Sequence, residues 1–178
     1  NQMEPLSRLS QDTVQETTQK ALDAFAMARQ LDPLSEHASI SPAQLLLKVV
    51  DYGYRESRQA SREAFLVSAG AKWYREQLDE IGNLLDRVRG SYQGDKPSNY
   101  VADCEAGLAR QIGDYSAALQ GWNSLIGQPG VFAPPIRRQI ARLYLSRIGN
   151  RWEDIPAREA DRIVELMEAN LREEPGSE

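Results

Sequence analysis

The chain contains little of the chemistry on which most enzyme sites depend. Its 178 residues include one cysteine, Cys104, and one histidine, His37. One cysteine excludes an intramolecular disulfide, and together with the absence of an Asn-x-Ser/Thr sequon this favours a reducing, cytoplasmic compartment. A Ser-His-Asp or Cys-His site would need His37, which lies in the loop-like stretch SEHAS with no motif around it.

Long hydrophobic runs and strand patterns are also missing. The longest apolar cluster, LLLKVV at 45–50, is interrupted by Lys48, and a membrane span needs roughly 20 apolar residues. Apolar and polar residues rarely alternate, so β-strands are not expected. The sequence therefore predicts a chain without a membrane segment.

The balance of charge limits the choice of ligand. The net charge is −5 and the isoelectric point is near 5.1. Nucleic-acid binding generally needs a basic surface, so a nucleic acid is not the expected main ligand. Apolar residues make up 41% and charged residues 26% of the chain, which is typical of a folded globular protein rather than a disordered one.

Motifs for phosphate, metal or nucleophile chemistry are absent. Neither GxGxxG nor GxxxxGK[ST] occurs, and the carboxylates lack the spacing of a calcium loop. Cys104 lies on the apolar stripe of its helix, where a buried thiol is the ordinary interpretation. We therefore predict no catalytic residue, no metal site and no cofactor, and a protein that is not an enzyme.

Helix signals fill the chain instead. Ser10 is expected to cap a helix that ends near Leu31, and Ser41-Pro42 to open the next one. Further helices are expected within 55–89, with breaks at Gly70 and Gly82, then after Ser98 as far as Gly113, at 115–126, around 136–144 and at 157–171. The class predicted is all-α.

Two segments share a spacing of small, aromatic and breaker residues. In ALDAFAMARQLDP, residues 21–33, the spacing runs through Ala21, Phe25, Ala28 and Pro33; GDYSAALQGWNSLIGQPG keeps it at Ala118, Trp122 and Leu125, with Pro129 one residue early. A third copy keeps the spacing alone, at Ile163, Met167, Asn170 and Pro175. Small residues let paired helices approach closely, and proline ends the second helix of a pair.

These segments resemble the tetratricopeptide repeat. The resemblance implies a right-handed α-solenoid of antiparallel helix pairs, with a concave surface that binds a protein or peptide. A non-repeating helical bundle is the alternative, because 36–97 shows no clean repeat and the loop 146–155 is longer than the turn of the family. The prolines at 33, 129 and 175 are also not spaced by multiples of the family's period.

The domain organisation expected is a single helical-repeat domain over 1–178. The loop GSYQGDKP at 90–97 separates sub-halves 1–89 and 98–178. The chain begins without methionine and shows no capping helices, so we expect a fragment of a larger protein, or self-association through a terminal helix such as 157–171.

Arginine placement is the one feature that suggests a binding site. Arg137, Arg138 and Arg142 share one expected helix, and Arg110 on the equivalent earlier helix could join them. Arginine pairs well with carboxylates and phosphates, so these four predict a site for an acidic peptide on a protein-interaction or scaffolding module. The plainer interpretation is a solvated polar face paired with Glu165 or Glu168. A nucleic-acid-binding helical repeat, or a regulatory or sensor domain of a larger protein, remains an alternative function.

Two further clusters have structural interpretations. Arg55, Arg58 and Arg62 alternate with Glu56 and Glu63, so this cluster is expected to neutralise itself. The pair Trp73-Tyr74 is expected to pack in the core.

Overall fold

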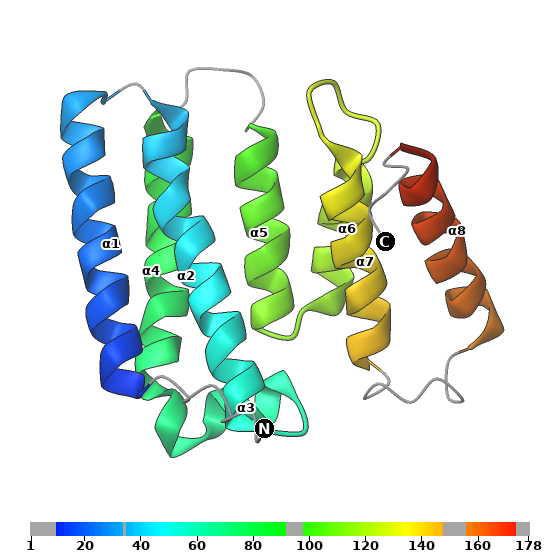
Figure 1. Ribbon diagram of the computed structural model, residues 1–178, viewed down its shortest axis with the longest axis horizontal. Coiled ribbons are helices and arrows are strands. Elements are labelled where there is room, and N and C mark those ends of the chain that lie inside the picture. Colours follow the sequence, from blue (N-terminus) through cyan, green and yellow to red (C-terminus); the bar gives the residue numbers. More distant parts are fainter. Residues whose placement is uncertain (1–9, 34, 92–97, 148–155, 174–178) are drawn as a thin grey trace, which may run out of the picture.

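The computed structural model describes residues 10–33, 35–91, 98–147 and 156–173. These residues form α1 (Gln11–Leu31), α2 (Glu36–Ser57), α3 (Arg62–Val67), the short 3-10 helix η1 (Ala69–Ala71), α4 (Lys72–Ser91), α5 (Asn99–Gln111), α6 (Tyr115–Leu125), α7 (Ala133–Arg147) and α8 (Ala157–Glu173). No strand occurs in these four segments (Figure 1). The all-α class predicted from the sequence is confirmed.

Serine side chains begin four of the helices. A serine hydroxyl accepts a hydrogen bond from the backbone N–H three residues further on, at Ser10 (3.1 Å), Ser35 (3.2 Å), Ser61 (3.1 Å) and Ser98 (3.3 Å). Each cap satisfies one of the N–H groups that a helix start leaves without an intrahelical partner. The caps expected at Ser10 and Ser98 are thus confirmed.

Two expected boundaries are wrong. The second helix begins at Glu36 rather than at Pro42, so that His37 lies on its exposed first turn and not in a loop. Ser35 supplies an earlier cap, and Ile40 is completely buried ahead of the proline, so packing keeps the first turns helical. Gly82 does not break a helix, because it lies within α4, where hydrophobic residues on both sides face the core.

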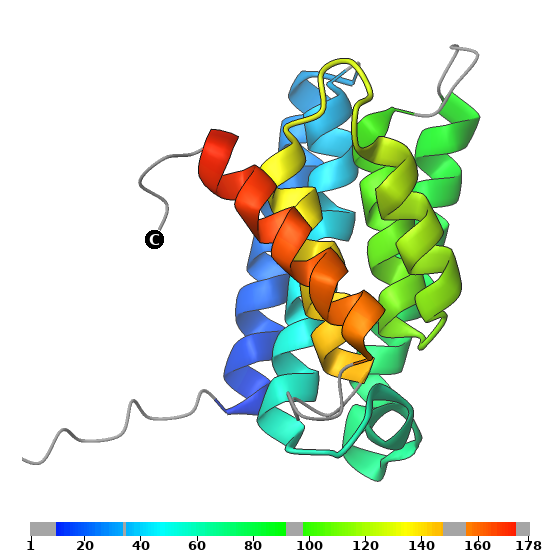
Figure 2. The same cartoon turned by 90° about the vertical axis from the view of Figure 1, so that its right-hand side faces the viewer.

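Helices that are near one another along the chain pack side by side. The closest pairings are α2 with α4, α5 with α6 and α7 with α8, and α1 covers α2. Between pairs, α5 contacts α2 and α4, while α6 contacts α7 (Figures 1 and 2). None of the described helices is long and apolar enough to cross a bilayer.

Two hydrophobic clusters form the interior, and α5 contributes to both. The first joins α2, α3, α4 and α5 and includes Tyr74, with Trp73 packed against it, which confirms that pair as a packing element. The second joins α5 to α8 around Trp122. Val101 and Cys104 of α5 belong to the first cluster and Ala106 to the second. Most of the expected loops at 90–97 and 146–155, and Pro175, lie outside the described residues.

Gly53 lies where α2 and α4 approach closely. A Cβ atom at this position would overlap the ring of Tyr74, whereas nothing lies within 4 Å of a Cβ atom built at Gly82. We expect Gly53→Ala to lower the free energy of unfolding by about 1–3 kcal/mol, because the overlap displaces a packed ring.

Gly82→Ala is the matched control, because it makes the same change in open space on a helix. It is expected to raise the free energy of unfolding by about 0.5–1 kcal/mol through helix propensity. Urea denaturation followed by circular dichroism measures both variants. Equal effects of the same sign would contradict the close packing at Gly53.

Candidate functional site

The structure divides the four arginines expected to form one row. Arg137 donates from Nη2 to Glu173 Oε1 (2.7 Å) and from Nη1 to Asn170 Oδ1 (3.3 Å), with only 12% of its side chain exposed. It therefore holds α7 against α8. Arg138 is half-buried and already makes an interaction, whereas Arg142 is exposed.

Arg110 joins three helices. Its Nη2 donates to Asp51 Oδ1 of α2 (3.0 Å), and its Nη1 donates to Gln139 Oε1 of α7 (3.2 Å). The side chain is 14% exposed. Arg142 is close enough for its charge to disfavour the charged form of Arg110. Arg110 and Arg142 therefore lie near one another, as the sequence suggests, whereas Arg137 pairs with residues of α8.

Asp51 is the carboxylate that three arginines share. Besides Arg110, it accepts from Arg62 Nη2 through Oδ1, and its Oδ2 lies 3.4 Å from Arg55 Nε. Arg62 is 4% exposed, donates from Nη1 to Gln111 Oε1, and stacks over the ring of Tyr54 at 4.4 Å. We call Asp51, Arg55, Arg62, Arg110 and Arg142 the arginine cluster.

Sequence reasoning missed the central members of this cluster. It assigned Arg62 to a self-neutralised group with Glu63, but the buried ion pair of Arg62 is with Asp51 on the preceding helix. No spacing rule within one helix could have found this pair, because Asp51 and Arg62 belong to different helices. The serine cap at Ser61 is a local signal for where α3 begins, but it does not indicate which carboxylate Arg62 meets.

The electrostatics of the cluster favour an added negative charge. Burial raises the pKa of the Asp51 carboxyl, but Arg110 and Arg62 outweigh burial and hold this pKa below its usual value. Burial and the repulsion of Arg62 lower the pKa of Arg110, and Asp51 only partly compensates. The Nε atoms of Arg62 and Arg110 are buried without a hydrogen-bond partner among the described residues.

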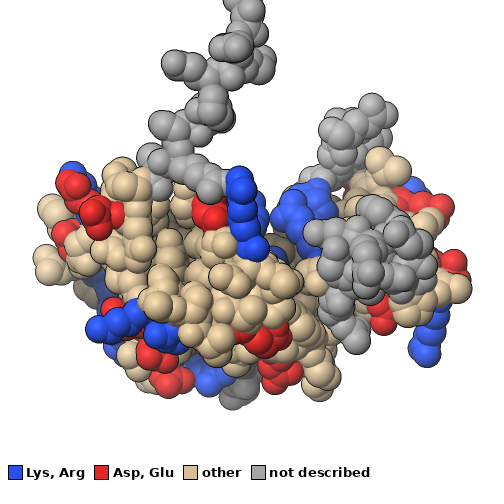
Figure 3. All heavy atoms as spheres, turned by 90° about the horizontal axis from the view of Figure 1, so that it is seen from below, with Lys and Arg blue, Asp and Glu red and all other residues tan. Residues whose placement is uncertain are grey.

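A cavity of about 250 Å³ opens beside Arg62. Tyr54, Ser61, Tyr115 and Ser146 are among the residues that line it. Glu63 is also part of the wall, and burial together with this carboxylate raises the pKa of Tyr115. Figure 3 shows this end of the molecule from below, with basic side chains on both sides of a hollow. The four arginines of the arginine cluster therefore lie near two carboxylates, those of Asp51 and Glu63.

A larger cavity, of about 550 Å³, lies at the opposite ends of α2 and α5. Glu36 and Asp103 supply its carboxylates, and Tyr100 and Phe132 its aromatic rings. Burial raises the pKa of Asp103, partly offset by the hydrogen bond that Trp122 Nε1 donates to its Oδ1 (2.8 Å). The Oε1 atom of Glu36 is buried without a hydrogen-bond partner among the described residues. We call this cavity the acidic pocket.

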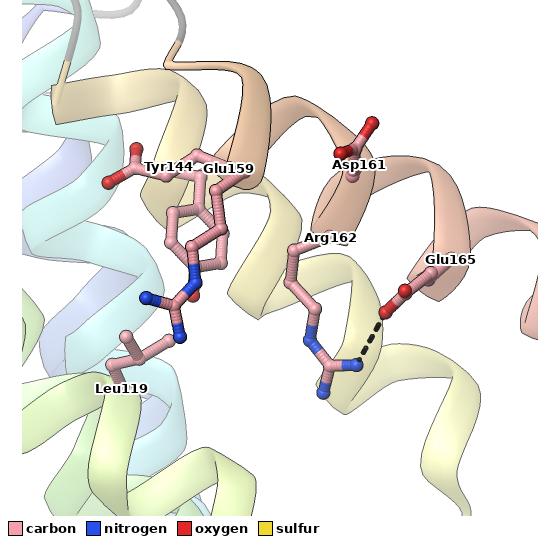
Figure 4. A pocket seen from close by; sticks show the side chains of 7 residues that line it. Leu119, Tyr144, Glu159, Asp161, Arg162 and Glu165 are labelled. Carbon is pink, nitrogen blue, oxygen red and sulfur yellow. Dashed lines mark hydrogen bonds and ion pairs between the residues drawn. The ribbon is translucent and has the colours of Figure 1, made fainter.

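A third cavity, of about 540 Å³, is formed by α6, α7 and α8 (Figure 4). Its α8 wall carries three acidic and two basic side chains, and Arg162 pairs there with Glu165 at 3.0 Å. The charges therefore compensate one another for the most part within the wall. Leu119 and Tyr144 close the other side of the cavity.

Side chains suited to metal or nucleophile chemistry do not gather in the part of the chain described. No group of three His, Cys, Asp or Glu side chains in that part could hold a metal ion. Cys104 is buried, and burial together with Asp103 and Glu105 raises its pKa to about 12. A thiol in this state is a poor nucleophile at neutral pH.

Comparison with known proteins gives no relative for this arrangement: no protein-family model, curated protein or solved structure matches the chain. The fold and the site therefore define its class as an all-α protein in which successive helices pack on one another.

Removing the Asp51 carboxylate tests whether the cluster is held together as described. Asp51→Asn is expected to lower the free energy of unfolding by about 3 kcal/mol, because it leaves the buried charge of Arg62 uncompensated. Glu80→Gln breaks the exposed pair with Arg87 and is expected to cost at most about 1 kcal/mol. Urea denaturation at pH 7 compares the two variants, and similar losses would contradict the special role of Asp51.

The dependence on pH gives a second test of Asp51. Because the folded state lowers its pKa, its ionised form stabilises the fold above the usual carboxyl pKa of about 4, and this contribution disappears as the pH falls through the lowered value. The stability difference between wild type and Asp51→Asn should be constant from about pH 5 to 8 and shrink at more acidic pH. A difference that grows on acidification would contradict the assignment.

Cys104 provides a test of the packing of α5. In the native protein at pH 8 its thiol should react with a thiol-specific disulfide reagent at least about 100-fold more slowly than in urea, because it is buried and almost entirely protonated. The absorbance of the released thiolate follows the reaction. Native labelling as fast as in urea would show that this part of the core opens readily.

Proposed function

We propose that this chain is a protein-interaction module without a catalytic step, and that it binds an acidic segment of a partner protein at the arginine cluster. The observation that carries the proposal is the charge imbalance around Asp51. Arg55, Arg62 and Arg110 pair with this one carboxylate, Arg142 adds a fourth positive charge, and Glu63 in the wall of the adjoining cavity supplies a second carboxylate. The imbalance is local, since the whole chain has a net charge of −5.

The chemistry of arginine supports an acidic ligand. A guanidinium presents a planar set of donors that fits a carboxylate, and its pairing with a carboxylate is strongest where water is partly excluded. Arg110 is 14% exposed and Arg55 is 67% exposed, so the cluster extends from the interior to solvent. An acidic side chain that approaches Arg55 and Arg142 would meet a region in which arginines outnumber carboxylates.

The finer part of the proposal is a short solenoid of the tetratricopeptide type. The pairs α2/α4, α5/α6 and α7/α8, with α5 on the first pair and α6 against α7, are compatible with stacked helix pairs. The tight turn between α5 and α6 supports it, because Gly113 has a φ of 88° there and Asp114 caps α6. In such a stack α2, α5 and α7 are the first helices of their pairs and line the binding surface.

Substitution of Arg142 tests the proposed function. Since Arg142 is exposed, Arg142→Gln is expected to fold normally and to weaken binding of an acidic peptide about fivefold, the loss of one partly exposed ion pair. The probe is a capped hexapeptide of glycine with two glutamates, titrated by calorimetry at low salt. The same peptide with glutamine in place of glutamate should not bind.

Lys72→Gln is the matched control, because it removes one exposed positive charge from α4 and should leave the affinity unchanged. Equal losses in both variants would mean that only the total charge matters, and the proposed site would be wrong. A single-stranded oligonucleotide that binds more tightly than the peptide, with Arg142 dependence, would instead favour the nucleic-acid alternative.

A further inference from the structure

The acidic pocket and the arginine cluster lie on the same side of three helices. Residues seven apart on an α-helix are nearly superimposed when viewed along its axis. This spacing relates Gln44 to Asp51 on α2, Asp103 to Arg110 on α5, and Pro135 to Arg142 on α7, and in each pair the first residue lines the acidic pocket and the second belongs to the arginine cluster. Figure 1 shows α5 between α2 and α7.

A short stretch of α5 separates the acidic pocket from the arginine cluster. Seven residues of helix advance roughly 10 Å, the distance covered by about three residues of extended chain. Gly107 is the residue of α5 between the pocket and the cluster on this side, whereas Ala106 is buried in the second hydrophobic cluster. A Cβ atom at Gly107 would lie 3.0 Å from Leu47 Cδ1, so α2 and α5 approach closely there.

The acidic pocket has the composition of a site for an organic cation. Its described lining includes Glu36 and Asp103 but no lysine or arginine. The unpartnered Oε1 of Glu36 is an acceptor already removed from water, so a donor that reaches it regains a hydrogen bond. Tyr100 and Phe132 keep 44% and 62% of their surface exposed, and aromatic faces attract ammonium and guanidinium groups.

We infer that this face binds an extended peptide segment in one orientation, with a lysine or arginine side chain in the acidic pocket and an acidic side chain about three residues away at the arginine cluster. This inference builds on the proposed function and names its ligand more closely. The opposite charges at the two ends make the reversed placement unfavourable, because like charges would then meet at both ends.

The test uses capped glycine hexapeptides that carry one lysine and one glutamate three positions apart. They are made in both chain directions, together with versions in which glutamine replaces the lysine or the glutamate. Calorimetry gives the dissociation constant for each peptide with the full chain. We expect the peptide with both charges to bind at least tenfold more tightly than either singly substituted peptide, in one chain direction only.

Glu36→Gln and Asp103→Asn connect this preference to the acidic pocket. Each variant should weaken binding of the lysine-containing peptide about fivefold and leave the affinity for its glutamine version unchanged. The amide oxygen of Asp103→Asn can still accept from Trp122 Nε1, so the core should stay intact. Glu16→Gln on α1, an exposed residue paired with Lys20, is the control with the same change of charge.

The possible results separate the two proposals. If the glutamate alone gives Arg142-dependent binding and the lysine adds nothing, the oriented site is wrong and the proposed function stands. Equal affinity for both chain directions, or an equal loss with Glu16→Gln, would also overturn the oriented site. If none of the peptides binds, both proposals are wrong.

Discussion

The charge of Arg62 is buried and must be compensated by an opposite charge. The junction of α2, α3, α5 and α7 depends on this constraint. An arginine that is 4% exposed has lost most of its hydration, and an unpaired charge in this position would cost several kcal/mol. Asp51 supplies the opposite charge, and Gln111 and the ring of Tyr54 occupy other parts of the guanidinium. Asp51 and Tyr54 lie one turn apart on α2, whereas Gln111 ends α5, so the pairing requires α2, α3 and α5 to be in register.

The same compensation leaves the surface with positive charge. Asp51 pairs with Arg62 in the interior and offsets the burial and repulsion that act on Arg110 only in part. Replacing the network by apolar residues could preserve or increase stability, but it would remove the guanidinium groups that an acidic ligand can use. The network thus joins two properties of the molecule, because the packing of α2 against α5 and the charge around the arginine cluster depend on one carboxylate.

Local sequence signals accounted for the class of fold and for most helix boundaries. Ser10 and Ser98 begin helices as expected because a capping hydroxyl acts within one turn. The prediction at Pro42 was wrong, because burial of Ile40 and the earlier cap at Ser35 extend α2 in the N-terminal direction. For the site, the interpretation that Arg110 could join Arg142 agrees with the influence of Arg142 on Arg110. The use of Arg137 to hold α8 depends instead on Asn170 and Glu173, far along the chain.

The sequence by itself determined that this protein is helical, because capping, helix periodicity and the scarcity of strand patterns act over a few residues. With one histidine and one cysteine, it also left few residues for histidine-dependent or disulfide chemistry. Only the tertiary structure decided which charges meet. Asp51 reaches Arg62 and Arg110 because three helices converge, and Asp103 and Glu36 share a pocket for the same reason. Such pairings depend on the packing of the whole core, which no local pattern encodes.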